Sequence, residues 1–246
     1  MKKFLTLLKI EGKLSLRCVD SIFFGVSMPV GIMILIGLIA GPNPASTDAG
    51  YTLIQSSFGA LVTVGICATA FMGIPLTIAD YRDKNILKHF FVTPVSPTML
   101  LWVHAIINML LSVVSALLIY AVAKTFFGYE MIGSKLMFML SYLLVMVSMY
   151  SLGLLIASLC RTVKTANVVC SIVYFPMLFL SGATIPFEIF PQPLQTVAGF
   201  LPLTQGIKLL KSASLGLETN LQMPLIILFG SLLIGIILSI RFFRWE

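Results

Sequence analysis

The chain has 246 residues, of which 59% are hydrophobic and 10% are charged, with a net charge of +7 and a mean hydropathy of +1.04. Ordinary soluble domains are about 25% charged, so this composition excludes a single water-soluble core. The chain lacks the ten-residue alternating segments of barrel strands and contains long apolar runs instead. It is therefore predicted to be a polytopic, all-α membrane protein.

Residues 1–20 precede the first apolar run and form a basic segment. Lys9, Lys13 and Arg17 recur at helical spacing, while Lys3 and Glu11 interrupt the apolar side. Two interpretations stay open, namely a leader that sets topology or a helix that lies in the cytoplasmic interface and is available to a partner. The apolar run that follows is longer than a signal-peptide core, so we expect it to remain in the protein.

Six apolar windows are long enough to cross a bilayer, which takes about 20 helical residues. They are 21–40, 57–79, 99–123, 136–159, 165–184 and 221–240. At the end of the first, Gly37 and Gly41 form a G-x-x-x-G pattern that favours a helix–helix contact, for example between subunits. We interpret the whole chain, 1–246, as one transmembrane domain.

Basic residues are distributed unevenly about these spans. Twelve of the sixteen Lys and Arg residues fall on the side of the two termini, and only Lys124, Lys135, Lys208 and Lys211 fall on the other. Because Lys and Arg near span ends stay in the cytoplasm, both termini are predicted to be cytoplasmic. The positive charge is thus attributed to topology, and no nucleic-acid partner is expected.

Residues 81–96, YRDKNILKHFFVTPVS, are a charged island between the second and third spans. They favour a short helix over 82–91 that stops before Pro94, since a residue that precedes proline avoids helical geometry. An isolated helix of this length is marginal in water, so we expect a partner to hold it. The alternative is a polar turn whose charges serve only topology.

Residues 185–218 are too apolar for a free loop and too rich in proline to span the membrane. Two short helices fit this segment. Irregular backbone at membrane depth must be surrounded by protein or water, so a re-entrant helical hairpin on the outer face is predicted before the last span.

The sequence offers little chemistry for catalysis or ion coupling. His104 is the one ionisable residue in the predicted spans and is interpreted as a satisfied interface residue. Phosphate-loop and hydrolase motifs are absent, and Cys18, Cys67, Cys160 and Cys170 have no metal-like spacing. The chain is therefore expected to be no enzyme and to bind no metal or cofactor. It should conduct passively or take energy from a partner.

The charged island resembles the cytoplasmic coupling segment of ABC-2 type transporter permeases, which commonly reads E-R-E-R-G-T-L-E-x-L-L-V-T-P-V-S. Residues 82–84 and 87 match it, as do the apolar pair at 90 and 91 and the sequence VTPVS at 92–96. The chain departs at Tyr81 and Lys88, where acids are common. It also departs at Asn85, where glycine is common, but asparagine tolerates the left-handed backbone that a kink requires.

The segment 179–216 is similar to the signature region of the same family. It has Ser-Gly at the end of the fifth span, then P-x-x-x-x-P-x-x-L-Q, then Pro-Leu-Thr at 202–204. It departs from the family pattern at Gln205 and Lys211, which leaves the subfamily open.

This resemblance implies a fold of six transmembrane helices. An interfacial helix would precede them, a cytoplasmic coupling helix would lie between spans two and three, and an extracytoplasmic re-entrant hairpin would precede span six. It also implies a function in a bacterial cell membrane as the permease subunit of an ATP-driven exporter. Two permeases, copies or paralogues, would each dock a separate cytoplasmic ATPase subunit that holds ATP and Mg.

The resemblance further implies two sets of site residues. Those that would couple to the ATPase are Arg82, Asp83, Lys84, Ile86, Leu87, Lys88, Phe90, Phe91, Thr93 and Pro94. Those that would form an outer gate are Pro186, Phe187, Glu188, Pro191, Pro193, Leu194 and Pro202.

The expected substrate is lipophilic or amphipathic, such as a drug, an antibiotic, a peptide or a lipid-like molecule, because spans one, two and five carry no fixed charge. Two other functions remain open, a passive channel and a membrane scaffold that transports nothing.

Overall fold

The computed structural model describes residues 2–16, 19–40, 50–86, 97–183, 187, 190–217 and 220–242. Within these ranges the chain forms helices and no strand. The elements are α1 (Lys2–Ser15), α2 (Val19–Ile22), η1 (Phe23–Ser27), α3 (Met28–Ala40), α4 (Leu53–Ala68), η2 (Thr69–Gly73), α5 (Ile74–Asp83), α7 (Pro97–Phe127), α8 (Lys135–Leu159), α9 (Val163–Leu180), α10 (Gln192–Gly199), α11 (Pro202–Leu215) and α12 (Gln222–Phe242).

Five helical segments of the described chain are long and apolar enough to cross a membrane. They are Leu53–Asp83, Met99–Phe127, Lys135–Leu159, Val163–Leu180 and Gln222–Phe242, and a shorter apolar helix covers Phe23–Ile39. Together they confirm an all-helical, multi-pass membrane protein. The sixth span and the re-entrant depth of the outer hairpin stay predictions.

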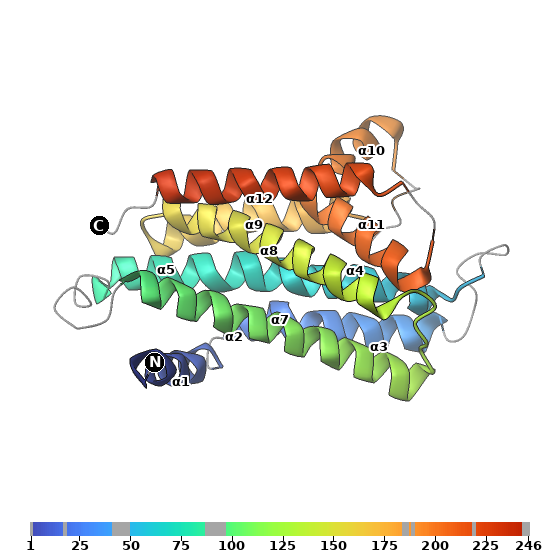
Figure 1. Ribbon diagram of the computed structural model, residues 1–246, viewed down its shortest axis with the longest axis horizontal. Helices are drawn as coiled ribbons and strands as arrows, with labels where there is room; N and C mark the ends of the chain where they lie inside the picture. Colours follow the sequence, from blue (N-terminus) through green and yellow to red (C-terminus); the bar gives the residue numbers. More distant parts are fainter. Residues whose placement is uncertain are drawn as a thin grey trace.

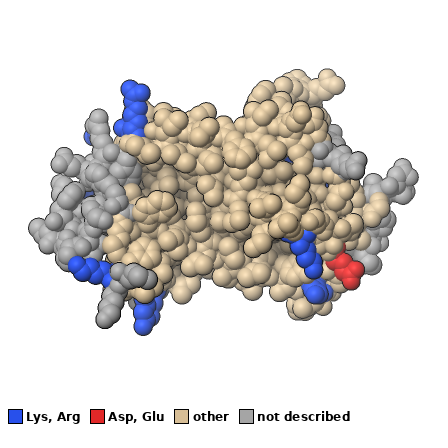
Figure 2. All heavy atoms as spheres, viewed as in Figure 1, with Lys and Arg blue, Asp and Glu red and all other residues tan. Residues whose placement is uncertain are grey.

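The long helices run side by side, and both termini lie at one end of the bundle (Figure 1). The continuous segment α4–η2–α5 is the most buried span and is packed against α3, α7, α8 and α11. By contrast, α12 lies at the periphery, where most of its side chains face outward. On the face of the molecule that Figure 2 shows, a broad central belt carries no charged side chains, and Lys and Arg side chains lie near the two ends.

Side chains at the helix starts explain several boundaries. Thr52 and Gln55 form a reciprocal capping box at the start of α4, in which the Gln55 backbone N–H donates to Thr52 Oγ1 over 3.2 Å and the Thr52 N–H donates to Gln55 Oε1 over 2.8 Å. Thr162 and Thr165 form the same arrangement before α9. Such caps satisfy backbone donors that have no partner within the helix, so these helices begin where the sequence provides a cap.

Two π-helical turns, η1 and η2, interrupt the first two apolar segments and pack against each other. They approach closely because Gly25 has no side chain, and a Cβ atom there would lie 2.5 Å from Thr69 Cγ2. The Tyr150 hydroxyl of α8 donates to Thr69 Oγ1 over 2.8 Å. Isolated π turns are frequent at functional sites, and here they hold three helices together in the core.

The G-x-x-x-G pattern at the end of the first apolar segment makes a contact within the chain. A Cβ atom on Gly37 would lie 2.1 Å from the Phe127 ring of α7, so this glycine makes room for an aromatic side chain. Gly41 lies outside the described residues.

The outer segment contains the two predicted short helices, α10 and α11. In α11 the side chains of Leu203, Ile207 and Leu210 are all buried, because this helix packs against α4 and α8. In α10, by contrast, Ala198 is buried but Val197 is 59% exposed. In Figure 1, α10 projects from the body of the bundle and therefore leaves much of its surface uncovered.

Candidate functional site

The predicted coupling segment begins at the end of α5, on the side of the molecule where the termini lie (Figure 1). The helix ends at Asp83, and Lys84 and Asn85 form a turn in which the Asn85 N–H donates to the Arg82 carbonyl over 3.0 Å. Asn85 has a φ of 56°, which confirms the left-handed kink predicted from its replacement of glycine. Arg82 and Asp83 are thus the last residues of α5, and the turn at Lys84 and Asn85 interrupts the short helix predicted over 82–91.

Ile86 resumes helical geometry after the kink and is half-buried. The remaining predicted coupling residues lie outside the described ranges. They are Leu87, Lys88, Phe90, Phe91, Thr93 and Pro94. Their contact with an ATPase stays a prediction.

Arg82 joins the end of α5 to the end of α8. Its Nη1 donates to the Ala157 carbonyl over 3.1 Å and also to the Cys160 carbonyl. The last carbonyls of a helix lack partners within that helix, and a positive charge there is favourable to the helix dipole. Arg82 therefore ties two spans together directly before the coupling segment.

Asp83 and Lys84 are exposed. The Lys84 ammonium pairs with the Asp80 carboxylate one turn earlier, at 2.8 Å. Exposed ion pairs of this kind contribute at most about 1 kcal/mol. Both residues are accessible from the end of the bundle, as a docking surface would require.

A polar cluster of Glu11, Tyr81 and His104 joins α1, α5 and α7, in which Glu11 and His104 are buried and Tyr81 is half-buried. The Tyr81 hydroxyl donates to Glu11 Oε2 over 2.5 Å, and His104 Nε2 lies 3.5 Å from the same oxygen. The Tyr81 and His104 rings meet edge to face, with centroids 5.3 Å apart. Burial raises the pKa of the Glu11 carboxyl, although the hydrogen bond from Tyr81 opposes this effect.

Sequence reasoning missed this cluster, although each member carried a signal. Glu11 interrupts the apolar side of the N-terminal helix, Tyr81 departs from the coupling motif, and His104 is a lone histidine in a span. A buried carboxylate requires polar partners, so an acid on an apolar helix face indicates such partners. Only the packing of α1 showed which ones.

Apolar contacts dock α1 on the membrane domain next to this cluster. Leu7 packs in a buried group with Leu100, Val103 and Ile107 of α7, and Tyr81 borders it. The N-terminal segment thus forms a helix that packs where α5 ends and the coupling segment begins. Its role toward a partner stays a prediction.

The predicted gate residues lie around α10 and the start of α11. Pro191 is the N-cap of α10, Pro193 lies in its first turn, and Pro202 is the first residue of α11. Leu194 is half-buried. The Lys208 ammonium lies over the Phe187 ring, 4.5 Å from its centroid. Pro186 and Glu188 lie outside the described residues.

Gln205, which departs from the family pattern, has a defined position. It is 4% exposed, and its Nε2 donates to the Gly199 carbonyl at the end of α10. This hydrogen bond fixes the turn between α10 and α11. Among the described residues no three His, Cys, Asp or Glu side chains are close enough to hold a metal ion.

The family model described as "ABC-2 type transporter" matches residues 2–215, which include α1, the coupling segment and α11. The chain belongs to the ABC-2 type transporter family. Its membrane helices are therefore those of a transport permease.

Curated relatives of this ABC-2 permease agree with that assignment. It is 24% identical over 191 residues to the Escherichia coli K12 protein "Probable multidrug ABC transporter permease YbhR", covering 76% of the chain and 50% of the relative. It is 26% identical over 129 residues to the E. coli K12 "Inner membrane transport permease YhhJ", covering 52% of the chain and 34% of the relative. A shorter match, 38% over 66 residues, is to "Nodulation protein J" of Rhizobium leguminosarum bv. viciae, covering 27% of the chain and 26% of the relative.

The permease thus spans about half the length, or less, of the curated relatives that it matches. Family membership establishes a membrane-spanning transport permease.

Proposed function

We propose that this ABC-2 permease is the membrane subunit of an ATP-driven exporter in a bacterial cell membrane. Two permeases would pair, and each would dock a cytoplasmic ATPase subunit that holds ATP and Mg. The observation that carries the proposal is the family match over residues 2–215. The matched residues include both the segment proposed to contact the ATPase and most of the membrane-spanning helices.

The orientation follows from the basic residues. The helix ends that carry Lys84, Arg161 and Arg241 lie at the same end of the bundle as the termini (Figure 1). Because Lys and Arg near span ends favour the cytoplasmic side, we place this end, with residues 81–96, in the cytoplasm. The outer hairpin formed by α10 and α11 then faces the opposite compartment.

Energy would reach the membrane through the coupling segment. Phe90 and Phe91 would fill a cleft of the ATPase, and the flanking charges would fix the register, as in helix-in-groove recognition. A displacement of that segment would act on α5, and through Arg82 on the end of α8. It would also act on α1 through Tyr81 and Glu11. The ATPase would favour one arrangement of these helices over another, which is what drives a conformational change.

The transported substrate is proposed to be lipophilic or amphipathic. The name of one relative refers to multidrug transport, and the apolar spans described above offer few fixed charges. The outer gate would include Phe187, Pro191 and Leu194, next to the ordered turn between α10 and α11.

Isolation of the tagged chain from its native membrane in mild detergent, followed by mass spectrometry, tests this function. A phosphate-loop ATPase should accompany the chain at near equal amounts, and a second permease would reveal a heterodimer. Recovery of the chain alone, under conditions that keep a known transporter intact, would favour the channel or scaffold instead.

A pair of variants tests the site of contact. Phe90→Ala with Phe91→Ala should release the ATPase or abolish stimulation of its activity. The matched control is Phe126→Ala with Phe200→Ala, because these two aromatic side chains are 76% and 63% exposed. They belong to the ends of α7 and α10, which lie toward the end of the bundle opposite the termini (Figure 1). Equal ATPase recovery and stimulation in both variants would contradict the proposed contact.

A further inference from the structure

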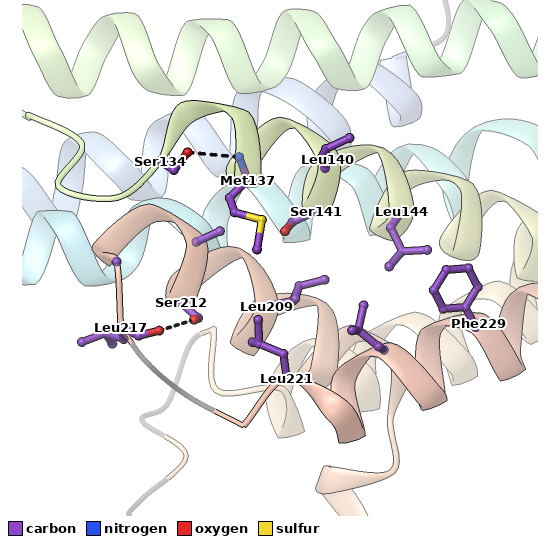
Figure 3. Close-up of a pocket in the computed structure, with 13 residues that line it drawn as sticks. Ser134, Met137, Leu140, Ser141, Leu144, Leu209, Ser212, Leu217, Leu221 and Phe229 are labelled. Atoms are coloured by element: carbon purple, nitrogen blue, oxygen red, sulfur yellow. Dashed lines mark hydrogen bonds between the residues drawn. The ribbon is translucent and has the colours of Figure 1, made fainter.

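A crevice of about 480 Å³ lies between the starts of α8 and α12 and the end of α11. Figure 3 shows Met137 and Leu144 of α8, Leu209 of α11 and Phe229 of α12 directed toward this space. Its volume lies in the range of pockets that hold small molecules, about 300–1,000 Å³. Its lining includes no residue of spans one, two or five, along which the substrate path is expected.

The chemistry of the lining is apolar. Two of its hydroxyl groups are used within the chain, since Ser212 Oγ donates to the Leu217 carbonyl over 2.8 Å and Ser134 Oγ accepts from the Met137 N–H over 3.5 Å (Figure 3). The lining residues carry no charged side chain. A ligand here would gain from burial of hydrocarbon, and a polar ligand would lose hydrogen bonds to water.

The crevice opens on the lipid-facing side of the helix bundle. Leu140 is 55% exposed and Phe229 is 51% exposed at its edge, and both belong to helices long and apolar enough to span. Hydrocarbon chains are the medium at that depth. At the end of the crevice, Ser134 and Leu221 adjoin the exposed polar residues Lys135 and Gln222, and polar and basic side chains at span ends favour the head-group level.

We propose that this crevice binds one acyl chain of a phospholipid from the leaflet at the hairpin end. The chain would lie between α8 and α12 and contact α11, with its head group near Lys135. The bound lipid would fill the space behind α11 and support its position. This inference is independent of the proposed ATPase, because the crevice and its lining exist in the single chain.

Photolabelling with a phospholipid that carries a diazirine in the middle of its acyl chain tests the site. The full-length chain, in the assembly in which it is isolated, is placed in vesicles of phosphatidylethanolamine and phosphatidylglycerol that contain the probe. Leu209 is the diagnostic residue because it lines the crevice but is only 3% exposed, so that lipids on the outer surface do not reach it. Leu233, which is 58% exposed on α12, reports those surface lipids.

The expected result is label on both Leu209 and Leu233. The variant Ala213→Phe fills the crevice from α11 and should lose the label on Leu209 while it keeps the label on Leu233. The matched control Ala121→Phe adds the same ring at an exposed position of α7 and should keep both labels.

Label on Leu233 without label on Leu209 in the unmodified chain would overturn the proposal, and this result does not depend on whether any variant folds. Label on Leu209 that persists in a folded Ala213→Phe chain would also overturn it. A cross-link from α8 or α12 to another protein chain, together with an unlabelled Leu209, would show that a protein covers the crevice instead. Loss of the ATPase from a chain still labelled on Leu209 would count against the proposed function alone.

Discussion

Single residues decide how closely the membrane helices of this permease approach. Gly153 of α8 faces η2, and a Cβ atom there would lie 2.3 Å from the Ala70 carbonyl oxygen. A backbone atom cannot move aside as a flexible side chain can, so the space at Gly153 is required by the packing.

Gly153→Ala is expected to lower the free energy of unfolding by about 1–3 kcal/mol, the usual cost of overpacking a core. Gly230→Ala in α12 is the matched control, because no atom other than its chain neighbours and the adjacent helix backbone lies within 4 Å of its added Cβ and alanine is the better helix former. Unfolding of both variants in detergent, followed by circular dichroism, compares them. Equal stability would show that the helices move apart at little cost.

Glu11 predicts a pH dependence for the docking of α1. Burial raises the pKa of its carboxyl in the docked state above the ordinary value of 4.5. The titratable groups that face the Glu11 carboxyl are Tyr81 and His104. A raised pKa means that the docked state binds a proton more tightly than the undocked state. Docking is therefore strongest at low pH and weakens as the pH rises through the raised pKa.

Modification of a cysteine introduced at Leu7, which is 9% exposed, measures this docking after the native cysteines are replaced. The rate should rise with pH more steeply than in the same chain with Glu11→Gln, which has no carboxyl to ionise. Identical pH profiles would mean that Glu11 does not titrate on docking.

At the scale of elements, the ends of α5 and α8 are coupled through Arg82. Arg82→Ala is expected to lower the free energy of unfolding by about 2 kcal/mol, within the range for hydrogen bonds to charged groups, because the Ala157 and Cys160 carbonyls lose a donor. Arg82→Lys should recover part of the loss, since an ammonium supplies charge without the planar fork. Thermal unfolding of the three chains provides the measurement.

A functional measurement distinguishes a role of Arg82 in coupling from a role in stability alone. With the ATPase present, Arg82→Ala should retain ATPase binding but reduce the stimulation of ATP hydrolysis by transport substrate. A variant that is less stable yet fully stimulated would show that Arg82 has no part in coupling.

At the scale of the whole molecule, the distribution of basic residues predicts that the two ends of the helix bundle lie in opposite compartments. Single cysteines at Gly12, Lys84 and Phe242 should react with a membrane-impermeant thiol reagent only from the cytoplasmic side. Single cysteines at Ile132 and Leu217 should react only from the outside. Labelling of intact cells and of inverted vesicles tests this arrangement, and reaction of Lys84→Cys and Ile132→Cys from one side would contradict the proposed topology.

The membrane class, the helical content and most span positions followed from the sequence alone, because about 20 apolar residues in a row have few alternatives to a transmembrane helix. The kink at Asn85 was also predicted, since few residues tolerate a left-handed backbone. The family followed from two motifs, at 81–96 and 179–216, and the family model confirms it.

Only the tertiary structure decided which polar groups meet. Glu11, Tyr81 and His104 are far apart in the chain, and their hydrogen bonds depend on the docking of α1 against α7. Arg82, whose role in ATPase coupling stays a prediction, binds the end of α8, and the sequence did not indicate this contact because it depends on two span ends meeting. Composition and periodicity report what each helix faces on average, whereas the partner of a buried polar side chain depends on how separate helices pack.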